Sequence, residues 1–308
     1  MARIVVVTPN PAIDVTYRVQ RQTVGDTHRV LETTRRPGGK GVNVARVLDA
    51  LGLPAVSVLP LGGASGEWML AALHDLGLRV ASIPLTGETR TTVTVADDEA
   101  HPTVFSEPGP IVTQAEWGML ATELRRQLDG ASMLIISGSL PQRSDATLVE
   151  SWVAEGHRAG VPVLVDATGD ALLAGARAGA EIVKPNLQEL LDTTGATAAE
   201  PGIRALLDLG ARLVVVSRGV DGITASDRDR DYTVDAIGGV SGSPTGAGDA
   251  ATAGLAAALI DGRAIGEALR WAAALGASAV LRPVAGEVDL DAFHLFLSKD
   301  THTDGAEA

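Results

Sequence analysis

Short, mostly apolar runs recur along the chain, and each run ends in small or polar residues. The clearest runs are 4–7, 56–61, 133–136, 163–165, 182–183 and 213–216. Runs of this length that are rich in β-branched residues are typical of strands buried on both faces of a parallel sheet. Longer segments of helical composition, such as 113–128 and 146–159, stand between them. This alternation predicts an α/β fold with a doubly wound, mostly parallel central sheet flanked by helices.

Two further segments, at about 12–36 and 88–106, alternate loosely between polar and apolar residues and carry charges. A period of two is typical of strands with one face in solvent. We therefore expect these strands to pair in a small sheet outside the main fold. The 308 residues suffice for one large domain, which we place at 1–298. The last residues, 299–308, are mostly polar and predict a disordered tail.

Polar residues follow several of the predicted strands. In open parallel sheets, ligands bind beyond the carboxyl ends of the strands, so these side chains are candidates for one ligand cleft. They are Asp14, Ser137, Ser139, Asp166, Lys184, Asn186, Glu189, Ser217 and Gly219. The acids Asp14 and Asp166 fit equally well as residues that hydrogen-bond a turn or cap a helix.

A glycine-rich stretch at 245–249, Thr-Gly-Ala-Gly-Asp, leads into an Ala-rich helix that we expect to end near residue 260. A glycine turn at a helix N-terminus presents unpaired backbone N–H groups and the positive end of the helix dipole, which together favour phosphate. Asp249 fits two roles there. It is a favoured helix-capping residue, and it is also a candidate general base beside a backbone anion hole. This stretch alone leaves both roles open.

A second glycine-rich stretch, at 38–43, reads Gly-Gly-Lys-Gly-Val-Asn. Its glycines allow a ligand to approach the backbone closely, and the helix that follows points its N-terminus at such a ligand. Lys40 adds a point charge, and Asn43 adds a donor and an acceptor. The stretch is not a Walker A loop, because Gly-x4-Gly-Lys-Ser/Thr is absent. A plain glycine turn with a solvated lysine is the alternative interpretation.

Composition narrows the class of protein. The formal net charge of −13 argues against a general nucleic-acid surface. The absence of Cys excludes disulfides, thiolate catalysis and Cys-ligated metals, and the six His residues show no metal-binding spacing. The chain has neither a signal-peptide pattern nor an apolar run of the ~20 residues that span a bilayer. These features predict a cytoplasmic protein.

Together the motifs resemble the ribokinase/PfkB family of carbohydrate kinases, in the right order over residues 3–296. The resemblance rests on segments 8–14, 38–45, 137–141, 184–189 and 245–249. The segments at 8–14 and 38–45 are most similar to 1-phosphofructokinases and tagatose-6-phosphate kinases. The resemblance implies a ribokinase-like fold whose small sheet acts as a lid and often forms a homodimer contact. It also implies ATP- and Mg²⁺-dependent phosphorylation of fructose 1-phosphate, fructose 6-phosphate or tagatose 6-phosphate.

The resemblance further implies a role for each candidate residue. Asp249 would be the base, and the N–H groups of Gly246, Ala247 and Gly248 would form the anion hole. Substrate would contact Asp14, Gly38, Gly39, Lys40, Asn43, Arg90, Ser137 and Ser139, with Lys40 and Arg90 on its phosphate. The nucleotide would contact Lys184, Ser217, Gly219, Gly222, Thr245 and Gly248. Asn186 and Glu189 would organise Mg²⁺ through water.

Three alternatives remain at the level of sequence. The chain could be a kinase of an unphosphorylated sugar or nucleoside, or a catalytically idle sugar-binding regulator on a kinase fold. A dinucleotide-binding dehydrogenase is a weaker alternative, because no Gly-x-Gly-x-x-Gly follows the first strand. Two residues depart from the family pattern: Pro244, where Thr or Ser is common, and Arg218, where Leu is usual. We expect Arg218 to bring a charge near the nucleotide.

Overall fold

The computed structural model describes residues 3–97 and 102–300, and within them the backbone forms two sheets and the helices around them. The large sheet has the order β13-β12-β11-β10-β9-β8-β1-β4-β5. Neighbours from β5 to β11 are parallel, and β12 and β13 are antiparallel additions at one edge. The strands are β1 (Arg3–Val7), β4 (Ala55–Gly62), β5 (Arg79–Leu85), β8 (Ala131–Ser137), β9 (Val163–Asp166), β10 (Ile182–Val183), β11 (Leu213–Ser217), β12 (Ile223–Ser226) and β13 (Asp231–Val234). This confirms the doubly wound, mostly parallel sheet.

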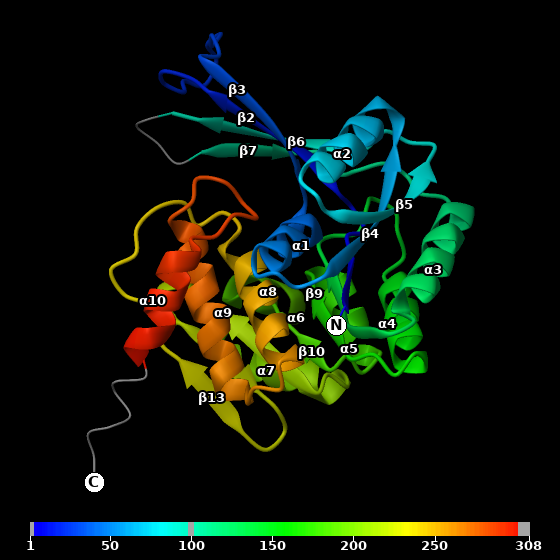
Figure 1. Ribbon diagram of the computed structural model, residues 1–308, viewed down its shortest axis with the longest axis vertical. Coiled ribbons are helices and arrows are strands. Elements are labelled where there is room, and N and C mark those ends of the chain that lie inside the picture. Colours follow the sequence, from blue (N-terminus) through cyan, green and yellow to red (C-terminus); the bar gives the residue numbers. More distant parts are fainter. Residues whose placement is uncertain (1–2, 98–101, 301–308) are drawn as a thin grey trace.

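Helices cover both faces of the large sheet, as Figure 1 shows. Val5 and Val7 of β1 pack with α3 to α7, whereas Ile4 and Val6 pack on the opposite face with α1, α8, α9 and α10. All four side chains are fully buried, which explains why the run is apolar at every position. The helices are α1 (Lys40–Ala50), α2 (Gly63–Asp75), α3 (Gln114–Leu128), α4 (Thr147–Arg158), α5 (Gly169–Arg177), α6 (Leu187–Thr194), α7 (Ala199–Leu209), α8 (Ala247–Ile260), α9 (Ile265–Val280) and α10 (Leu290–Asp300).

The small sheet has the order β3-β2-β6-β7 and stands at the top of the view in Figure 1. Its strands are β2 (Ala12–Arg18), β3 (Glu32–Gly38), β6 (Arg90–Ala96) and β7 (Thr103–Ser106). Most of their residues are only partly buried, as their alternating sequence predicts. The chain thus forms the predicted second sheet outside the main fold.

The strand order reverses at β1, which lies between β4 and β8. Such a reversal opens a crevice at the carboxyl ends of the strands, where ligands bind in open α/β sheets. The N-termini of α1 and α8 lie close together there, since Asn43 of α1 hydrogen-bonds Asp249 of α8. The topology therefore selects one end of the large sheet, beneath the small sheet, as the candidate site.

The predicted C-terminal boundary at residue 298 falls inside α10, which continues to Asp300. Most of the predicted disordered tail, residues 301–308, lies outside the described residues. Among the helices that the structure describes, none is long and apolar enough to cross a membrane.

Candidate active site

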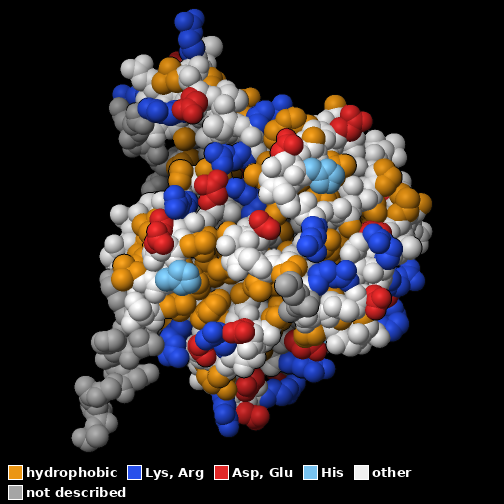
Figure 2. Space-filling view, viewed as in Figure 1, with side chains coloured by type: hydrophobic (Ala, Val, Ile, Leu, Met, Phe, Trp, Pro, Cys, Tyr) orange, Lys and Arg blue, Asp and Glu red, His pale blue; other side chains and the backbone are white. Residues whose placement is uncertain are grey.

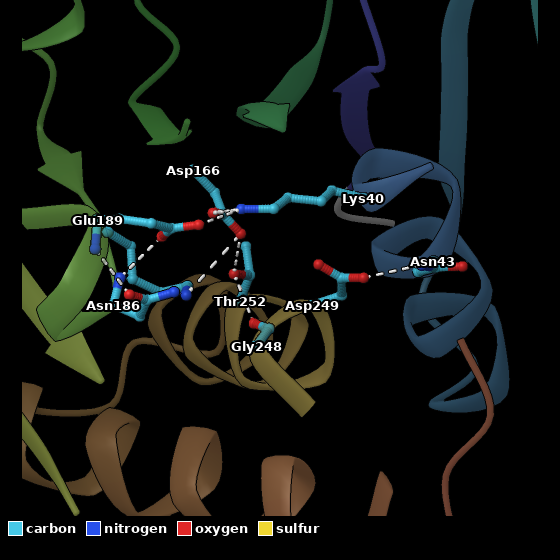
Figure 3. A network of polar contacts seen from close by, with 9 residues as sticks. Lys40, Asn43, Asp166, Asn186, Glu189, Gly248, Asp249 and Thr252 are labelled. Carbon is cyan, nitrogen blue, oxygen red and sulfur yellow. Dashed lines mark hydrogen bonds and ion pairs between the residues drawn. The ribbon is translucent and has the colours of Figure 1, made fainter. Parts of the chain in front are cut away.

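Asp249 lies in the first turn of α8 and is only 8% exposed. The N-cap of α8 is Gly246, and no side chain caps the helix among the described residues, so the capping interpretation of Asp249 is wrong. Its carboxylate instead accepts a hydrogen bond from Asn43 Nδ2, with a distance of 2.8 Å to Oδ2 (Figure 3). Burial, and then the negative charge of Asp166, raise the pKa of Asp249 to about 7, despite the opposing effects of Asn43 and two lysines. A carboxylate with this pKa suits a general base at neutral pH.

Gly246 adopts a left-handed conformation, with φ 84°, directly before α8. A Cβ there would lie 2.8 Å from Cα of Ala285, so the turn has room only for glycine. The N–H groups at the start of α8 have no intrahelical acceptor, as at any helix N-terminus. The Ala247 N–H donates to the carbonyl oxygen of Pro244 at 3.2 Å in this structure. The turn is a potential anion hole next to the Asp249 carboxylate.

Asp166, at the end of β9, is the centre of a buried polar network (Figure 3). Thr252 Oγ1 donates to its Oδ2 at 2.7 Å, and Lys184 Nζ lies 3.8 Å from the same oxygen. Burial alone would raise the pKa of Asp166, but Lys184, Lys40 and Thr252 outweigh burial and lower it. Asp166 is therefore an anion at neutral pH. Thr252 also lies 3.0 Å from the carbonyl oxygen of Gly248, so the network joins β9 to the first turn of α8.

Lys40 is the first residue of α1, and its side chain extends to two carboxylates (Figure 3). Nζ donates to Glu189 Oε1 at 2.9 Å and lies 3.7 Å from Asp166 Oδ1. Burial would lower the pKa of Lys40, but the charges of Asp166 and Glu189 outweigh it and raise the pKa. Lys40 is thus a permanent cation held between acids that belong to two other elements.

Asn186 and Glu189 form a capping box at the start of α6. Asn186 Oδ1 accepts from the backbone N–H of Glu189 at 2.8 Å, and Glu189 Oε2 accepts from that of Asn186 at 2.9 Å. The second oxygen of Glu189 contacts the Lys40 ammonium, so this carboxylate already faces a cation. Among the described residues no three acidic or imidazole side chains form a metal cage. One or two carboxylates with nucleotide phosphates and water are the usual Mg²⁺ ligands, and the set around Glu189 fits that chemistry.

The opposite wall of the site comes from the small sheet. Asp14 lies directly behind Gly38, where a Cβ would come within 1.9 Å of Asp14 Oδ2, so Gly38 makes room for this carboxylate. Burial raises the pKa of Asp14 to about 6, although the nearby charges of Arg90 and Arg46 lower it. Arg90 Nη1 donates to Ser106 Oγ and to the carbonyl oxygen of Glu107, both at 2.9 Å. Acidic and basic side chains lie side by side where the small sheet meets the body (Figure 2).

Two predicted substrate residues lie on the loop after β8. Ser139 is exposed, and its Oγ is 3.5 Å from Asn10 Nδ2. Ser137 is fully buried, and its Oγ has no hydrogen-bond partner among the described residues. Ser139 is therefore open to a ligand, and Ser137 is not exposed in this structure.

A mostly apolar cavity of about 460 Å³ lies beside the start of α8. Its wall includes four of the predicted nucleotide residues, Ser217, Gly219, Gly222 and Gly248, together with Asn186, Pro244 and small side chains of α9. Of the described residues, the predicted Lys184 and Thr245 are not part of this wall: Lys184 is buried against Asp166, and Thr245 is exposed.

Arg218 does not line this cavity, and its expected place near a nucleotide stays a prediction. It follows Ser217, the last residue of β11, and lies outside the strand. Ser217 lines the cavity, whereas Arg218 lines two hollows on the side of α6 and α7. One of these hollows shares Val220 and Ala236 with the cavity, so Arg218 borders a space next to it.

Three residues of the site were given no role from the sequence. Asp166 was recognised only as an acid at a strand end. Nothing in the sequence marked Thr252 as a site residue except its position one turn after Gly248. Arg46 lies in the middle of α1, donates to the carbonyl oxygen of Ala285 at 2.8 Å and lies 3.2 Å from Glu287. Thr252 and Arg46 reach the site only through helix packing, which sequence spacing does not reveal.

Comparisons with known proteins identify a matching family and a relative. The profile of a family described as pfkB family carbohydrate kinase matches residues 4–291. The ATP-dependent 6-phosphofructokinase isozyme 2 of Mycobacterium tuberculosis is 32% identical over 288 residues, which are 91% of this chain and 85% of the relative.

Solved structures show the same fold. Phosphofructokinase-2 from Escherichia coli in complex with potassium has a TM-score of 0.91 at 28% identity, covering 98% of this chain and 100% of that chain. Its complex with fructose-6-phosphate has a TM-score of 0.88, also at 28% identity, covering 97% and 99%. A ribokinase of Arabidopsis thaliana, 22% identical, has a TM-score of 0.77 and covers 96% of this chain and 99% of that chain. The predicted ribokinase-like fold is confirmed.

Proposed function

The chain belongs to the pfkB family of carbohydrate kinases, and we propose that it transfers the γ-phosphoryl group of ATP to a hydroxyl of a phosphorylated ketohexose, with fructose 6-phosphate as the first candidate. Family membership makes it a phosphotransferase with an alcohol group as acceptor. The observation that carries the proposal is the buried Asp249 carboxylate, which lies beside a glycine turn at a helix N-terminus. The relative named as a 6-phosphofructokinase favours fructose 6-phosphate.

The reaction needs a base, an anion hole and correct positioning. The sugar hydroxyl oxygen bonds to the γ-phosphorus, the bond from that phosphorus to the ADP oxygen breaks, and the hydroxyl proton passes to Asp249. The N–H groups of Gly246, Ala247 and Gly248 stabilise negative charge on the transferred group. Asn43 holds the Asp249 carboxylate in place through their 2.8 Å hydrogen bond.

Mg²⁺ would be held by Asn186 and Glu189 through water, together with the ATP phosphates. When bound, it neutralises charge on those phosphates. The cavity next to Gly248 and Ser217 would receive the nucleoside, because its mostly apolar wall suits a base and it reaches the first turn of α8. Lys184 and Thr245 stay proposed contacts of the nucleotide outside the described wall of that cavity.

The sugar would lie between the large sheet and the lid. Asp14 and Asn43 would hold its hydroxyls, with Gly38 and Gly39 beneath it, and Lys40, Arg90 and Ser139 would hold the phosphate that the substrate already carries. Arg90 is partly exposed at the base of the lid, and Ser139 is open on the facing loop. Ser137 stays a proposed contact through the same loop.

Fructose 1-phosphate is the second candidate, and tagatose 6-phosphate the third. The Gly-Gly-Lys-Gly stretch favours them, since its lysine resembles that of 1-phosphofructokinases and tagatose-6-phosphate kinases. Phosphorylation of either fructose phosphate gives the same bisphosphate, so identifying the product cannot separate the two. The choice needs a comparison of substrates.

A coupled ADP-release assay tests the proposal. We expect turnover with ATP and Mg²⁺ in the order fructose 6-phosphate, then fructose 1-phosphate and tagatose 6-phosphate, with much weaker turnover of ribose and adenosine. Highest kcat/KM for an unphosphorylated sugar or a nucleoside would replace the proposal with a kinase of that class. Sugar binding without turnover of any acceptor would indicate an idle regulator.

We also propose a homodimer through the lid. The lid exposes Val24, Val30, Leu31, Val104 and Phe105, between 40% and 101% of each side chain. A cluster of exposed large apolar side chains on a small sheet favours a protein contact.

Sedimentation velocity should give roughly twice the chain mass of 31.6 kDa. Phe105→Glu should shift the protein toward the monomer, whereas Met119→Glu, at an exposed position of α3, should leave the mass unchanged. A monomeric wild type at micromolar concentration would exclude this contact.

A further inference from the structure

Lys40 does not lie free beneath the lid. Its ammonium is held by Glu189 at 2.9 Å and by Asp166 at 3.7 Å, as Figure 3 shows. Both acids follow strand ends of the large sheet, whereas Lys40 starts the helix that follows the lid. In the ligand-free state, the cation that the proposed function assigns to the substrate phosphate is thus paired with Asp166 and with Glu189, the proposed metal residue.

We propose that Lys40 is a tethered cation: its ammonium occupies the Glu189–Asp166 carboxylate pair until a divalent cation binds, and it then turns to the phosphate of the sugar. Metal ion and sugar phosphate would therefore bind cooperatively, because both of them favour the same position of the Lys40 ammonium, away from the carboxylates. This inference rests on the proposed function, because it takes Glu189 as a metal residue and a sugar phosphate as substrate.

The charge balance supports this exchange. The ammonium groups of Lys40 and Lys184 cancel the carboxylates of Asp166 and Glu189. These four side chains carry no net charge together. A divalent cation that enters meets Glu189 and Asp166 oxygens that are already paired with the Lys40 ammonium. Once Lys40 leaves, the remaining charge attracts the metal, and the freed ammonium needs an anion, which a phosphate supplies.

The position of the Lys40 side chain supports its movement toward the sugar phosphate. The Lys40 side chain is 37% exposed, against 3% for Lys184, so only Lys40 has room to move. Its stem runs past the loop after β8, where a Cβ at Gly138 would lie 3.8 Å from Lys40 Cβ. Ser139, a proposed phosphate contact, is the next residue of that loop. Rotation of a flexible four-carbon stem therefore carries the ammonium from the acids toward the sugar site.

Thermodynamic linkage makes the proposal measurable without turnover. If the metal releases Lys40 for the sugar phosphate, the sugar phosphate must tighten metal binding by the same factor. Mn²⁺ serves as the probe, because its free concentration is read directly by electron paramagnetic resonance. No nucleotide is added, so phosphoryl transfer plays no part in the signal.

The experiment compares the wild type with Lys40→Met, Arg90→Met and Glu189→Gln, each with and without fructose 6-phosphate and, separately, fructose 1-phosphate. We expect one of the two sugar phosphates to tighten Mn²⁺ binding to the wild type about fivefold or more. Lys40→Met should bind Mn²⁺ about tenfold more tightly than the wild type without sugar phosphate, and sugar phosphate should no longer change that affinity. Arg90→Met also removes one positive charge, but Arg90 does not pair with Glu189 or Asp166. Without sugar phosphate, this variant should keep the wild-type Mn²⁺ affinity.

Equal or weaker Mn²⁺ binding by Lys40→Met would overturn the proposal, as would a wild-type affinity that neither sugar phosphate changes. If Lys40→Met fails to fold, the Mn²⁺ affinity of the wild type with and without sugar phosphate decides the question. Wild-type Mn²⁺ binding that survives in Glu189→Gln would instead refute the metal assignment of the proposed function. Turnover in the ADP-release assay reports the kinase activity independently of both.

Discussion

Asp249→Asn is expected to lower kcat by about 10²–10⁴-fold while the dissociation constant of ATP stays within about threefold of wild type. The substitution keeps the shape of the side chain and an oxygen that can accept from Asn43 Nδ2. It removes the negative charge and, with it, the capacity to take the hydroxyl proton. Steady-state kinetics with fructose 6-phosphate and calorimetric titration of nucleotide measure the two quantities.

The pH dependence gives a second readout of the same substitution. A base must be deprotonated, and burial with the charge of Asp166 raises the pKa of Asp249 to about 7. Wild-type kcat/KM should therefore rise with pH up to about 7 and level off above it, and the residual activity of Asp249→Asn should lack this step. Turnover of the variant within twofold of wild type would exclude Asp249 as the base.

Gly246→Ala is expected to lower kcat by about 10²–10³-fold, the usual effect of losing one anion-hole donor. The residue has φ 84°, and a Cβ would meet Cα of Ala285 at 2.8 Å, so the turn must move and misdirect its N–H groups. The proposed sugar contacts lie on α1, the lid and the loop after β8, and we therefore expect KM for the sugar phosphate to change little.

Gly266→Ala is the matched control for this substitution. Gly266 lies in the first turn of α9, and no described heavy atom lies within 4 Å of a Cβ built there. Its kcat should equal that of the wild type, and its melting temperature should stay the same or rise slightly. Wild-type kcat in a folded Gly246→Ala protein would show that the turn contributes no anion hole.

The two sheets followed from the sequence because burial dictates their composition. The run at 4–7 is apolar throughout since Ile4 and Val6 pack on one face of the sheet and Val5 and Val7 on the other. The lid strands alternate because one of their faces meets solvent. The glycines at 38–43 were predicted to let a ligand approach the backbone closely. In the structure Gly38 makes room for the Asp14 carboxylate, and Gly246 makes room for the backbone of Ala285.

The sequence did not predict the surroundings of several side chains, because these depend on which way each side chain faces and on what packs over it. Ser217 lines the cavity beside α8, whereas the next residue, Arg218, lines two other hollows beside α6 and α7. Lys184 remains a predicted nucleotide contact, and the burial of its ammonium beside Asp166 was not foreseen. Thr252 joins the site because α8 packs against the end of β9. Such partners follow from tertiary packing and leave no trace in local spacing.

The central claim, a kinase built for a sugar that already carries a phosphate, is tested most directly by one ratio. It is kcat/KM for fructose 6-phosphate over kcat/KM for free fructose, measured with the wild type at saturating ATP and Mg²⁺. We predict a ratio of about 10³ or more, because Lys40 and Arg90 lose their anionic partner when the phosphate is absent. Similar values for the two sugars would contradict the claim.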